Sequence, residues 1–410
     1  MRGMTESARY PLSDDPAHVV EGFHAPGFEG VRDAFVRNFR DGQEIGASLA
    51  IEIDGEPVLD LWGGYADADA RWPWKRDSLS VVFSNTKPAT ALCAHLLAQD
   101  GLLDLDRPVH HYWPAFADSA RRAITPRMFL DHSAGLPALR ETLPAGAAFD
   151  WEAMADRLGR EEPFWQPGTR VGYHGLTFGW LVGELVRRVA GVPVGEFFDR
   201  RIAAPLGLDF WIGLPEAEEA RVAPIVPASP SASPRNAFEA EIAANPGGIP
   251  ALYLRNTGGW RPSGFNARIG HAAQIPAANG ITNARSLARL YGTLAMGGSR
   301  GDFRLIDPLR LAQAAEISSA THVDACLCVP TRFGAGFMRS MDNRALDCDS
   351  AVLGADAFGH VGAGGSVAFA SPPRRMGFAY TMNRMGPGVL LNERGDRLIE
   401  AAYRALDTLT

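Results

Sequence analysis

Residues 82–103, VFSNTKPATALCAHLLAQDGLL, hold one of only two lysines in a chain of 410 residues. Of the 40 basic residues, 38 are arginine. Lys87 stands three positions after Ser84, where an apolar run begins that predicts a helix from about Ser84 to Gln99. A chain that uses arginine almost everywhere has kept a lysine here, which indicates a need for an amine rather than for a positive charge.

The spacing of Ser84 and Lys87 is typical of a serine nucleophile with its base. A serine hydroxyl reacts near pH 7 only when a base within hydrogen-bond reach takes its proton. Residues three apart share one face of a helix, so we expect the Ser84 oxygen beside the Lys87 amine. The positive end of the helix favours the neutral amine, and its free N–H groups can stabilise an oxyanion. Arginine cannot replace lysine here, because the guanidinium stays protonated in proteins.

The composition makes several kinds of partner unexpected. The formal charge is −7 and no run of basic residues could follow a phosphate backbone, so we expect no nucleic-acid partner. No segment approaches the roughly 18 apolar residues of a membrane helix, and the first 20 residues lack the apolar core of a signal peptide. We therefore expect a soluble, cytoplasmic protein without a membrane partner. The cysteines and histidines lack metal-site spacing, so neither a metal nor another cofactor is expected.

Strand patterns lie near both ends of the chain, with helical patterns between them. ASLAIEI (47–53) and EPVLDLWGG (56–64), joined by Asp54-Gly55, predict an antiparallel hairpin with which the sheet should begin. Strand patterns return within residues 356–383, and a last helix is expected from about Leu391 to Leu406. We therefore predict an α/β (α+β) fold with an antiparallel sheet flanked by helices. Residues 1–86 and 285–410 would form the sheet domain, and residues 87–284 an inserted, mainly helical domain.

Two further motifs follow the serine and lysine in order. WQPGTRVGYHGLTFGWLVGELV (165–186) places Tyr173 ahead of a helical pattern, and FGHVGAGGSVAFA (358–370) places His360-Val361-Gly362 before a glycine-rich turn. Together the three motifs resemble the serine β-lactamase and penicillin-binding-protein superfamily, most closely the family VIII carboxylesterases. The resemblance covers about residue 48 to the C-terminus, includes HSAGLP and AANGITNARSLARL, and implies a β-lactamase/transpeptidase-like fold.

The resemblance implies a role for each motif. Ser84 would be the acylated nucleophile, and Lys87 and Tyr173 would act in the transfer of its proton. The sequence leaves open which of the two accepts the proton first. The backbone N–H groups of Ser84 and Ala363 would form the oxyanion hole. The residues of the third motif implied to bind substrate are His360, Gly362, Gly364 and Gly365, of which the last two allow close approach of the backbone.

The activity implied is that of a serine carboxylesterase that hydrolyses short-chain acyl esters through an acyl-enzyme, with weak β-lactam hydrolysis as a side activity. Penicillin-directed members carry a lysine at the position of His360 and an asparagine at that of Gly175. A histidine is mostly neutral at pH 7 and glycine has no side-chain amide, so we expect a small-molecule ester as substrate. The alternatives are a β-lactamase, a D-aminopeptidase or amide hydrolase, an acyltransferase, and a non-catalytic binding protein on this fold.

Residues 224–280 are rich in Pro, Gly, Ser, Ala and Asn. A loop of this length in a compact protein is usually a functional lid or a disordered segment, and its aromatic residues favour a lid. Trp260 and Phe265 would either line an acyl pocket or anchor this lid on the core.

A rival serine motif occurs at residues 297–301, GGSRG, which fits the G-x-S-x-G pattern of α/β-hydrolases. That motif requires a strand before the serine and a helix after it. Here a helical pattern precedes Ser299 and a strand pattern follows, so we expect a surface turn.

Overall fold

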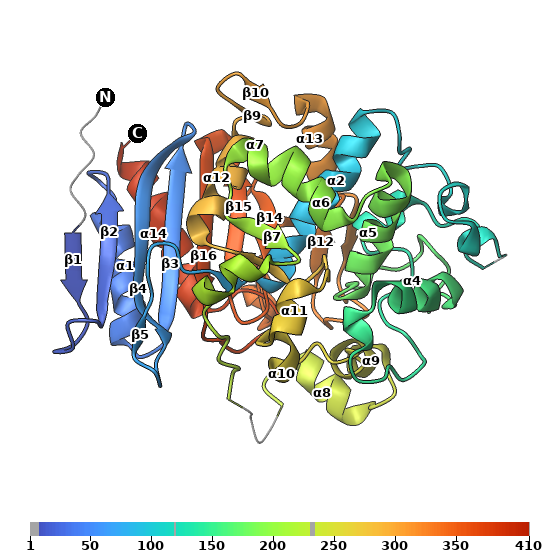
Figure 1. The fold of residues 1–410 in the computed structure, drawn as a ribbon, viewed down its shortest axis with the longest axis horizontal. Coiled ribbons are helices and arrows are strands. Elements are labelled where there is room, and N and C mark those ends of the chain that lie inside the picture. The colour runs from blue at the N-terminus through green and yellow to red at the C-terminus, as the bar shows by residue number, and fades with distance from the viewer. Residues whose placement is uncertain (1–7, 119, 230–233, 410) are drawn as a thin grey trace.

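One large antiparallel sheet runs through the structure, a computed structural model that describes residues 8–118, 120–229 and 234–409 (Figure 1). The strand order is β1-β2-β4-β3-β16-β15-β14-β13-β12-β11, with β5 attached to β4. Strands from the two ends of the chain therefore pair in the middle of the sheet, where β3 meets β16. The strands are β1 (Ala8–Pro11), β2 (Val19–His24), β3 (Gly46–Ile53), β4 (Glu56–Asp67), β5 (Trp72–Pro73), β11 (Ser319–Thr321), β12 (Thr331–Phe333), β13 (Met338–Arg339), β14 (Phe358–Val361), β15 (Val367–Ser371) and β16 (Met376–Met382).

Helices flank this sheet and make up most of the middle of the chain (Figure 1), which confirms the expected fold class. Short strands also occur there, as a second sheet of β6 (Ser80–Val81), β8 (Gly280–Thr282) and β7 (Phe210–Ile212). The α-helices are α1 (Glu29–Arg40), α2 (Thr86–Gln99), α3 (Pro126–Leu130), α4 (Trp151–Arg160), α5 (Thr177–Ala190), α6 (Val194–Phe198), α7 (Ala204–Leu206), α8 (Ala237–Ala244), α9 (Ile249–Arg255), α10 (Pro262–Phe265), α11 (Arg268–Ala272), α12 (Ala284–Ala295), α13 (Pro308–Ala315) and α14 (Glu393–Leu409).

The two faces of the sheet carry side chains of different size. Successive residues of a strand point to opposite faces, so small and large residues that alternate in the sequence separate in space. Helix α12 packs on the face with small residues, and α1 and α14 pack on the face with large ones. The residues concerned include Ala50, Ala368 and Ala379 on the first face, and Leu49, Phe369 and Phe378 on the second.

The predicted hairpin is confirmed, but the sheet does not begin with it. Asp54 and Gly55 have φ angles of 55° and 78° between β3 and β4, as a tight hairpin turn requires. The expectation that the sheet starts near residue 47 is wrong, because β1 and β2 extend it beyond β4. β1 is the edge strand and β2 its neighbour, and both are partly exposed, so they lack the regular apolar pattern of an inner strand.

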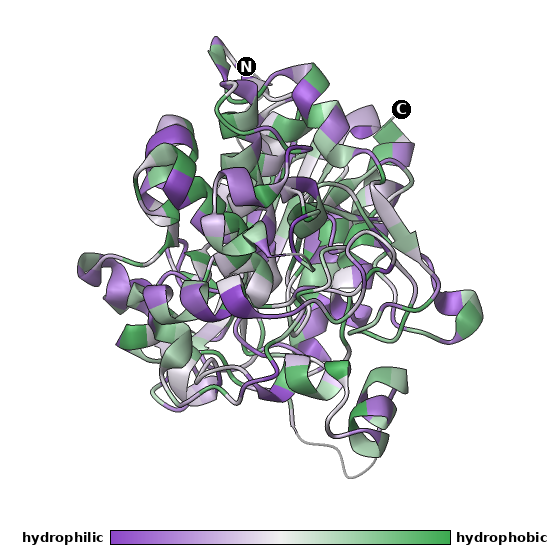
Figure 2. Cartoon of the chain, turned by 90° about the vertical axis from the view of Figure 1, so that its right-hand side faces the viewer, coloured by the Kyte–Doolittle hydropathy of each residue, from purple (hydrophilic) through white to green (hydrophobic). Residues whose placement is uncertain are grey.

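The region expected to be a lid, residues 224–280, contains short helices joined by loops. It contains α8 to α11, each short, and its residues 230–233 lie outside the described part of the chain. Proline or glycine precedes or opens several of these helices, which explains why the composition resembled a loop. Figure 2 shows hydrophilic and hydrophobic residues alternating along the helices at the edge of the molecule.

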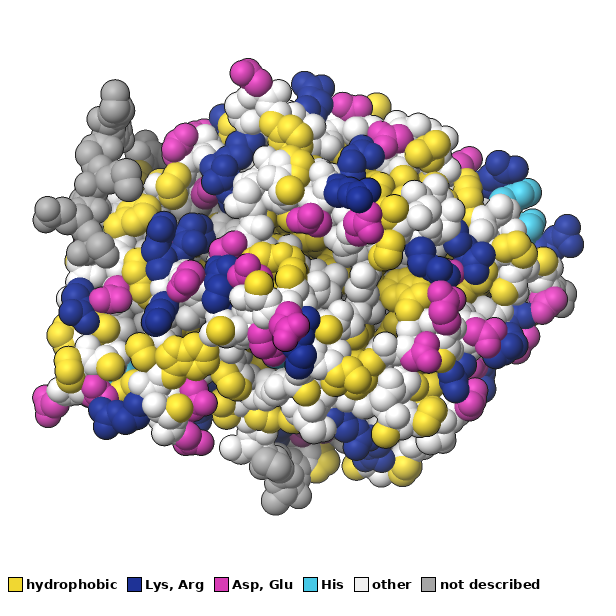
Figure 3. Space-filling view, in the orientation of Figure 1, with side chains coloured by type: hydrophobic (Ala, Val, Ile, Leu, Met, Phe, Trp, Pro, Cys, Tyr) yellow, Lys and Arg dark blue, Asp and Glu magenta, His cyan; other side chains and the backbone are white. Residues whose placement is uncertain are grey.

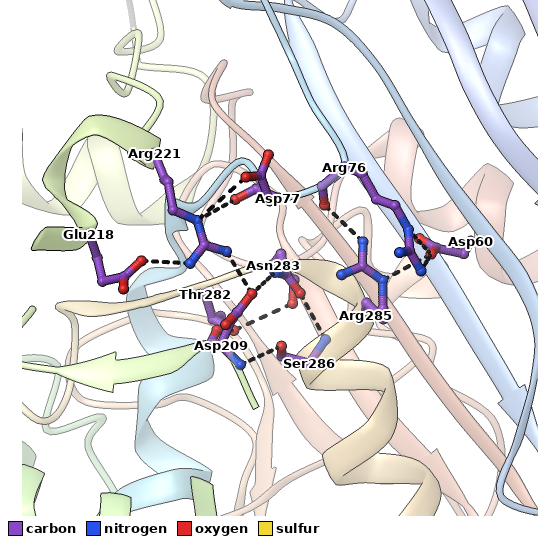
Figure 4. Close-up of polar contacts among 10 residues, drawn as sticks. All are labelled: Asp60, Arg76, Asp77, Asp209, Glu218, Arg221, Thr282, Asn283, Arg285 and Ser286. Carbon is purple, nitrogen blue, oxygen red and sulfur yellow. Dashed lines mark hydrogen bonds and ion pairs between the residues drawn. The ribbon is translucent and has the colours of Figure 1, made fainter. Parts of the chain in front are cut away.

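A polar network fixes the start of α12 between the two sheets (Figure 4). Asn283 caps the helix by accepting from Ser286 N at 2.9 Å. Arg285 in its first turn donates to Asp60 of β4 at 2.9 Å. Arg221 pairs with Asp209 and Glu218 at 2.6 Å, beside β7. These arginines are partly exposed, so each pair adds little stability, but together they set the position of the helix.

Acidic and basic side chains are interspersed over the face of the molecule that Figure 3 shows. Across the described ranges, no helix is both long enough and apolar enough to cross a membrane.

Candidate active site

Ser84 is the one accessible residue in a buried segment. Every other residue from 78 to 97 is buried, and Ser84 alone is partly exposed. It lies in a 3-10 turn, Phe83–Asn85, that leads directly into α2. Phe83 has a φ of 46°, a left-handed conformation that is unusual for a large side chain and recurs at functional sites. The turn thus holds one hydroxyl at the surface of an otherwise closed core.

The strained turn at Phe83 is fixed by a threonine. The Thr86 hydroxyl donates to Phe83 O at 2.6 Å and accepts from Gly280 N at 2.8 Å. Thr86 is fully buried, so these contacts are shielded from water. They connect the turn before α2 to strand β8.

The Lys87 amine contacts three oxygen atoms. Its Nζ lies 3.0 Å from Ser84 Oγ, as the sequence predicts, 2.7 Å from Gly175 O and 3.1 Å from Ala277 O. The two carbonyls can only accept hydrogen bonds, so they occupy two N–H donors. A neutral amine has two such donors and one lone pair, and the lone pair is then left for the Ser84 hydroxyl.

Burial favours this neutral form. Lys87 is 1% exposed, and desolvation holds the pKa of its amine well below the ordinary value of 10.5. The Tyr173 ring centroid is 4.7 Å from Nζ, a contact that opposes the effect by favouring the ammonium form. The burial effect prevails, because the hydrogen-bond partners of the amine are neutral oxygens and no carboxylate is among them.

Tyr173 lies against the same amine and remains protonated. Burial raises the pKa of its phenol well above 10.0, and a side-chain hydrogen bond with Ser84 only partly offsets this. The Tyr173 backbone N–H donates to Asp324 Oδ1 at 3.0 Å, which fixes the residue just ahead of α5. At neutral pH the site therefore has an amine that can accept a proton and a phenol that can donate one.

Three buried histidines around the site are held neutral. His174 donates from Nδ1 to Gly172 O at 2.7 Å and accepts at Nε2 from Leu136 N at 3.0 Å. Burial lowers the pKa of His174 to about 3 and also lowers that of His132, whose ring centroid is 4.9 Å from that of Tyr173. The His132 ring therefore packs against Tyr173 in its neutral form, and His174 adds no charge next to it.

His360 on β14 is fixed in one tautomer. Its Nδ1 lies 2.7 Å from Val361 O, so Nδ1 carries the proton and Nε2 is left as an acceptor. Nε2 is buried and has no partner among the described residues. Burial lowers the pKa of His360 to about 3. The side chain can accept one hydrogen bond near Tyr173, 5.9 Å away between ring centroids, but offers no positive charge.

These pKa shifts predict a simple pH profile. The proton-acceptor role that the resemblance implies for Lys87 requires the neutral amine, so raising the pH should increase kcat/KM until a plateau well below pH 10.5. His360 and His174 have pKa values near 3 and add no change in this range. Initial rates on a p-nitrophenyl ester from about pH 5 to about pH 9 measure the profile. Activity that falls as the pH rises would contradict a neutral Lys87 as proton acceptor.

The glycine-rich turn after β14 lies against the serine. A Cβ atom on Gly362 would be 2.5 Å from Val82 O, so only glycine fits there. Asn85 Nδ2 donates to Ser366 Oγ at 3.0 Å and ties the turn to the start of α2. Ala363 is exposed, and no described residue accepts from its backbone N–H. This N–H is thus available to an oxyanion.

The same turn is held from behind by a buried ion pair. Arg394 Nη2 donates to Gly364 O at 2.7 Å, and its Nη1 lies 2.9 Å from Glu44 Oε2. Asn392 Nδ2 also donates to Gly364 O, at 3.0 Å. Gly364 and Gly365 have φ angles of 85° and 112°, which only glycine adopts readily. The two glycines therefore allow the tight bend, and the side chains of Arg394 and Asn392 hold it in place through hydrogen bonds to Gly364 O.

Replacing Arg394 by methionine is expected to lower the free energy of unfolding by about 3 kcal/mol, because it leaves the Glu44 carboxylate buried without its cation. Chemical denaturation followed by circular dichroism measures the loss. Arg394→Met combined with Glu44→Leu removes both charges and should recover most of it. A single variant as stable as the wild type would show that the pair does not support the turn.

Trp260 and Phe265 are buried beneath the serine turn. The Phe265 ring packs edge-on against Phe83 at 5.4 Å and against Trp260 at 5.7 Å. Both side chains belong to the main apolar core. These contacts agree with the interpretation that the two residues anchor residues 224–280 on the core, and a role in lining an acyl pocket stays a prediction.

Two supporting residues were not predicted from the sequence. Asp324 is buried and accepts from three backbone N–H groups, those of Tyr173, Cys326 and Leu327. Arg394 is the other. A single acidic or basic residue in a sequence usually indicates solvent exposure, so no signal distinguished them.

In the described ranges, no group of three His, Cys, Asp or Glu residues could hold a metal ion.

Comparison with known proteins extends the likeness to nearly the whole chain. Residues 32–403 match the family described as Beta-lactamase. Esterase/beta-lactamase LipL from Mycobacterium tuberculosis (strain ATCC 25618 / H37Rv) is 35% identical over 395 residues, which are 93% of this chain and 87% of that protein. The crystal structure of a family VIII carboxylesterase is 38% identical with a TM-score of 0.82 and covers 94% of this chain and 99% of that one. A penicillin-binding protein homolog from Caulobacter crescentus is 37% identical with a TM-score of 0.84 at the same coverage.

Proposed function

The chain belongs to the Beta-lactamase family, and from that premise we propose that it is a serine carboxylesterase acting on short-chain acyl esters through an acyl-enzyme on Ser84. One observation carries the proposal. The Lys87 amine is held by the carbonyls of Gly175 and Ala277 and lies 3.0 Å from Ser84 Oγ, in an environment that favours its neutral form. The names of an esterase relative and a carboxylesterase neighbour support the substrate class.

Acylation begins when Lys87 takes the Ser84 proton. The serine oxygen attacks the ester carbonyl carbon, and the oxyanion formed is stabilised by the backbone N–H groups of Ser84 and Ala363. Collapse breaks the bond to the alkoxy oxygen, to which the Tyr173 phenol gives its proton. The alcohol leaves, and the acyl group stays on Ser84.

Deacylation uses water as the second nucleophile. Water attacks the acyl carbon and gives a proton to the Tyr173 oxygen. Ser84 then leaves as the oxyanion collapses and takes back its proton from the Lys87 ammonium. The carboxylic acid is released, and all three residues return to their starting protonation states.

The two departures from the penicillin-directed pattern favour esters. His360 is neutral and can only accept a hydrogen bond through Nε2, so it gives no cation for a substrate carboxylate. Gly175 offers its carbonyl to Lys87 and has no side-chain amide for a substrate amide. An ester has no N–H to satisfy, so it loses less from this change than an amide does.

The test is a ratio of specificities. We expect kcat/KM for p-nitrophenyl butyrate to exceed that for a chromogenic cephalosporin by at least about a hundredfold. Mass spectrometry of the enzyme quenched during turnover should show one added butyryl group on the peptide that contains Ser84. A preference for the cephalosporin would favour β-lactamase activity instead, and an acyl group on any other residue would refute the proposed mechanism.

A further inference from the structure

Tyr253 of α9 lies directly over Gly175, the residue whose carbonyl binds the Lys87 amine. A Cβ atom on Gly175 would be 1.9 Å from Cε2 of the Tyr253 ring and 2.9 Å from Cζ. The φ angle of Gly175 is not in the left-handed region, so its backbone does not require glycine. The three atoms nearest to such a Cβ all belong to the Tyr253 ring, so a side chain at this position would require a neighbour to move.

The tyrosine is held firmly in this place. Its ring packs edge-on against Tyr173 at 6.2 Å and against Phe238 at 5.9 Å. At the end of α9, Asn256 accepts from Leu143 N at 2.8 Å and donates to Leu139 O at 2.9 Å. These contacts hold the Tyr253 ring in one position between α9 and Tyr173.

The Tyr253 ring also lines a cavity of about 20 Å³. Tyr253, Leu139, Leu176 and Leu252 line it, together with polar side chains. Three buried atoms of these polar side chains have no partner in the described part of the chain, namely Thr177 Oγ1, Trp180 Nε1 and Thr257 Oγ1. Such groups favour a ligand atom that can form hydrogen bonds. The cavity thus combines apolar side chains with polar atoms that lack a partner.

We propose that Tyr253 determines the acyl specificity of this site, because its ring fills the space beside Gly175 and separates that space from the cavity that the ring also lines. The inference rests on the proposed function. With the tyrosine in place, the site takes short acyl groups. Without its ring, the space above Gly175 would join the cavity, and the site would accept a longer acyl chain that ends in a hydroxyl group.

Tyr253→Ala tests this inference with two esters on one protein. We expect the ratio of kcat/KM for p-nitrophenyl 6-hydroxyhexanoate to that for p-nitrophenyl butyrate to rise by at least about tenfold. Unsubstituted p-nitrophenyl hexanoate should gain less, because it leaves the three polar groups unpaired. Leu254→Ala is the matched control, since Leu254 is the next residue of α9 and is 49% exposed, and it should keep the wild-type ratio.

A second pair of variants tests the contact itself. Gly175→Ala should lower kcat on the butyrate ester by about a hundredfold, because the new methyl group displaces either Tyr253 or the carbonyl that binds Lys87. Tyr253→Ala in the same chain should restore at least about tenfold of this loss. No recovery in the double variant would overturn the claim that the ring excludes a side chain at position 175.

The outcomes separate this inference from the esterase proposal. A wild-type protein that hydrolyses none of the three esters refutes the proposed function. A wild type that is active on butyrate, with a ratio unchanged in a folded Tyr253→Ala variant, refutes only the role of Tyr253. If circular dichroism shows that the alanine variant is unfolded, Tyr253→Leu makes a smaller opening, and a ratio that stays within about twofold of wild type then overturns the inference.

Discussion

Replacing Ser84 by alanine is expected to lower kcat/KM for p-nitrophenyl butyrate by roughly 100,000-fold, as loss of a covalent nucleophile does in other serine hydrolases. The substitution removes the only accessible hydroxyl of the segment and leaves Lys87 without the group it activates. Ser84 is small and partly exposed, so the melting temperature should change little. Steady-state rates and a thermal melt on the same preparation measure both.

Ser299 provides the matched control. It lies in the G-x-S-x-G stretch, which the structure forms as a small hairpin of β9 (Ser299–Arg300) and β10 (Phe303–Arg304), with no helix after the serine. Ser299→Ala should keep activity within about twofold of wild type. A Ser84→Ala enzyme with more than about one percent of wild-type activity would mean that the acyl group is carried elsewhere.

The sequence predicted the family, the fold class and the contact between Ser84 and Lys87 because these depend on local patterns. Three positions along a helix bring two side chains together whatever the rest of the chain does. Alternation of apolar residues likewise defined β3, β4 and β14 to β16 before their partners were known. The comparisons confirm the family, and the structure confirms these elements.

The parts that could not be predicted depend on residues far apart in the chain. Asp324 contacts Tyr173 across about 150 positions, and Arg394 reaches Glu44 across 350. The helices of residues 224–280 gain stability from packing, as Phe265 does against Phe83, and their short, proline-rich sequences resemble loops. The catalytic roles of Ser84, Lys87 and Tyr173 and the substrate-binding role of His360 remain predictions.

Gly175 shows what a sequence alone leaves out. The sequence indicated only that a side-chain amide is missing at this position. In the structure the same space is occupied by Tyr253, which comes from a segment 78 positions further along the chain. The absence of a side chain at one position is thus compensated by a ring from another element.

Lys87→Arg is expected to lower kcat/KM for p-nitrophenyl butyrate by roughly 10,000-fold, although it keeps the positive charge and most of the length. Guanidinium does not lose its proton in this pH range, so it cannot accept the Ser84 proton. The guanidinium group also has five N–H donors, whereas the buried lysine amine has three oxygen atoms as hydrogen-bond partners.

Lys75→Arg gives the control with the same chemical change, because Lys75 is the other lysine of the chain and is exposed. Its activity should stay within about twofold of wild type. A folded Lys87→Arg enzyme with more than about a tenth of wild-type activity would show that position 87 needs only a charge. Tyr173 would then be the first proton acceptor, but its phenol is buried with a pKa raised well above 10.0. Burial keeps the phenol protonated, so it has no free base form to accept the Ser84 proton, whereas it leaves the lysine amine neutral with a free lone pair. We therefore expect the arginine variant to be folded and inactive.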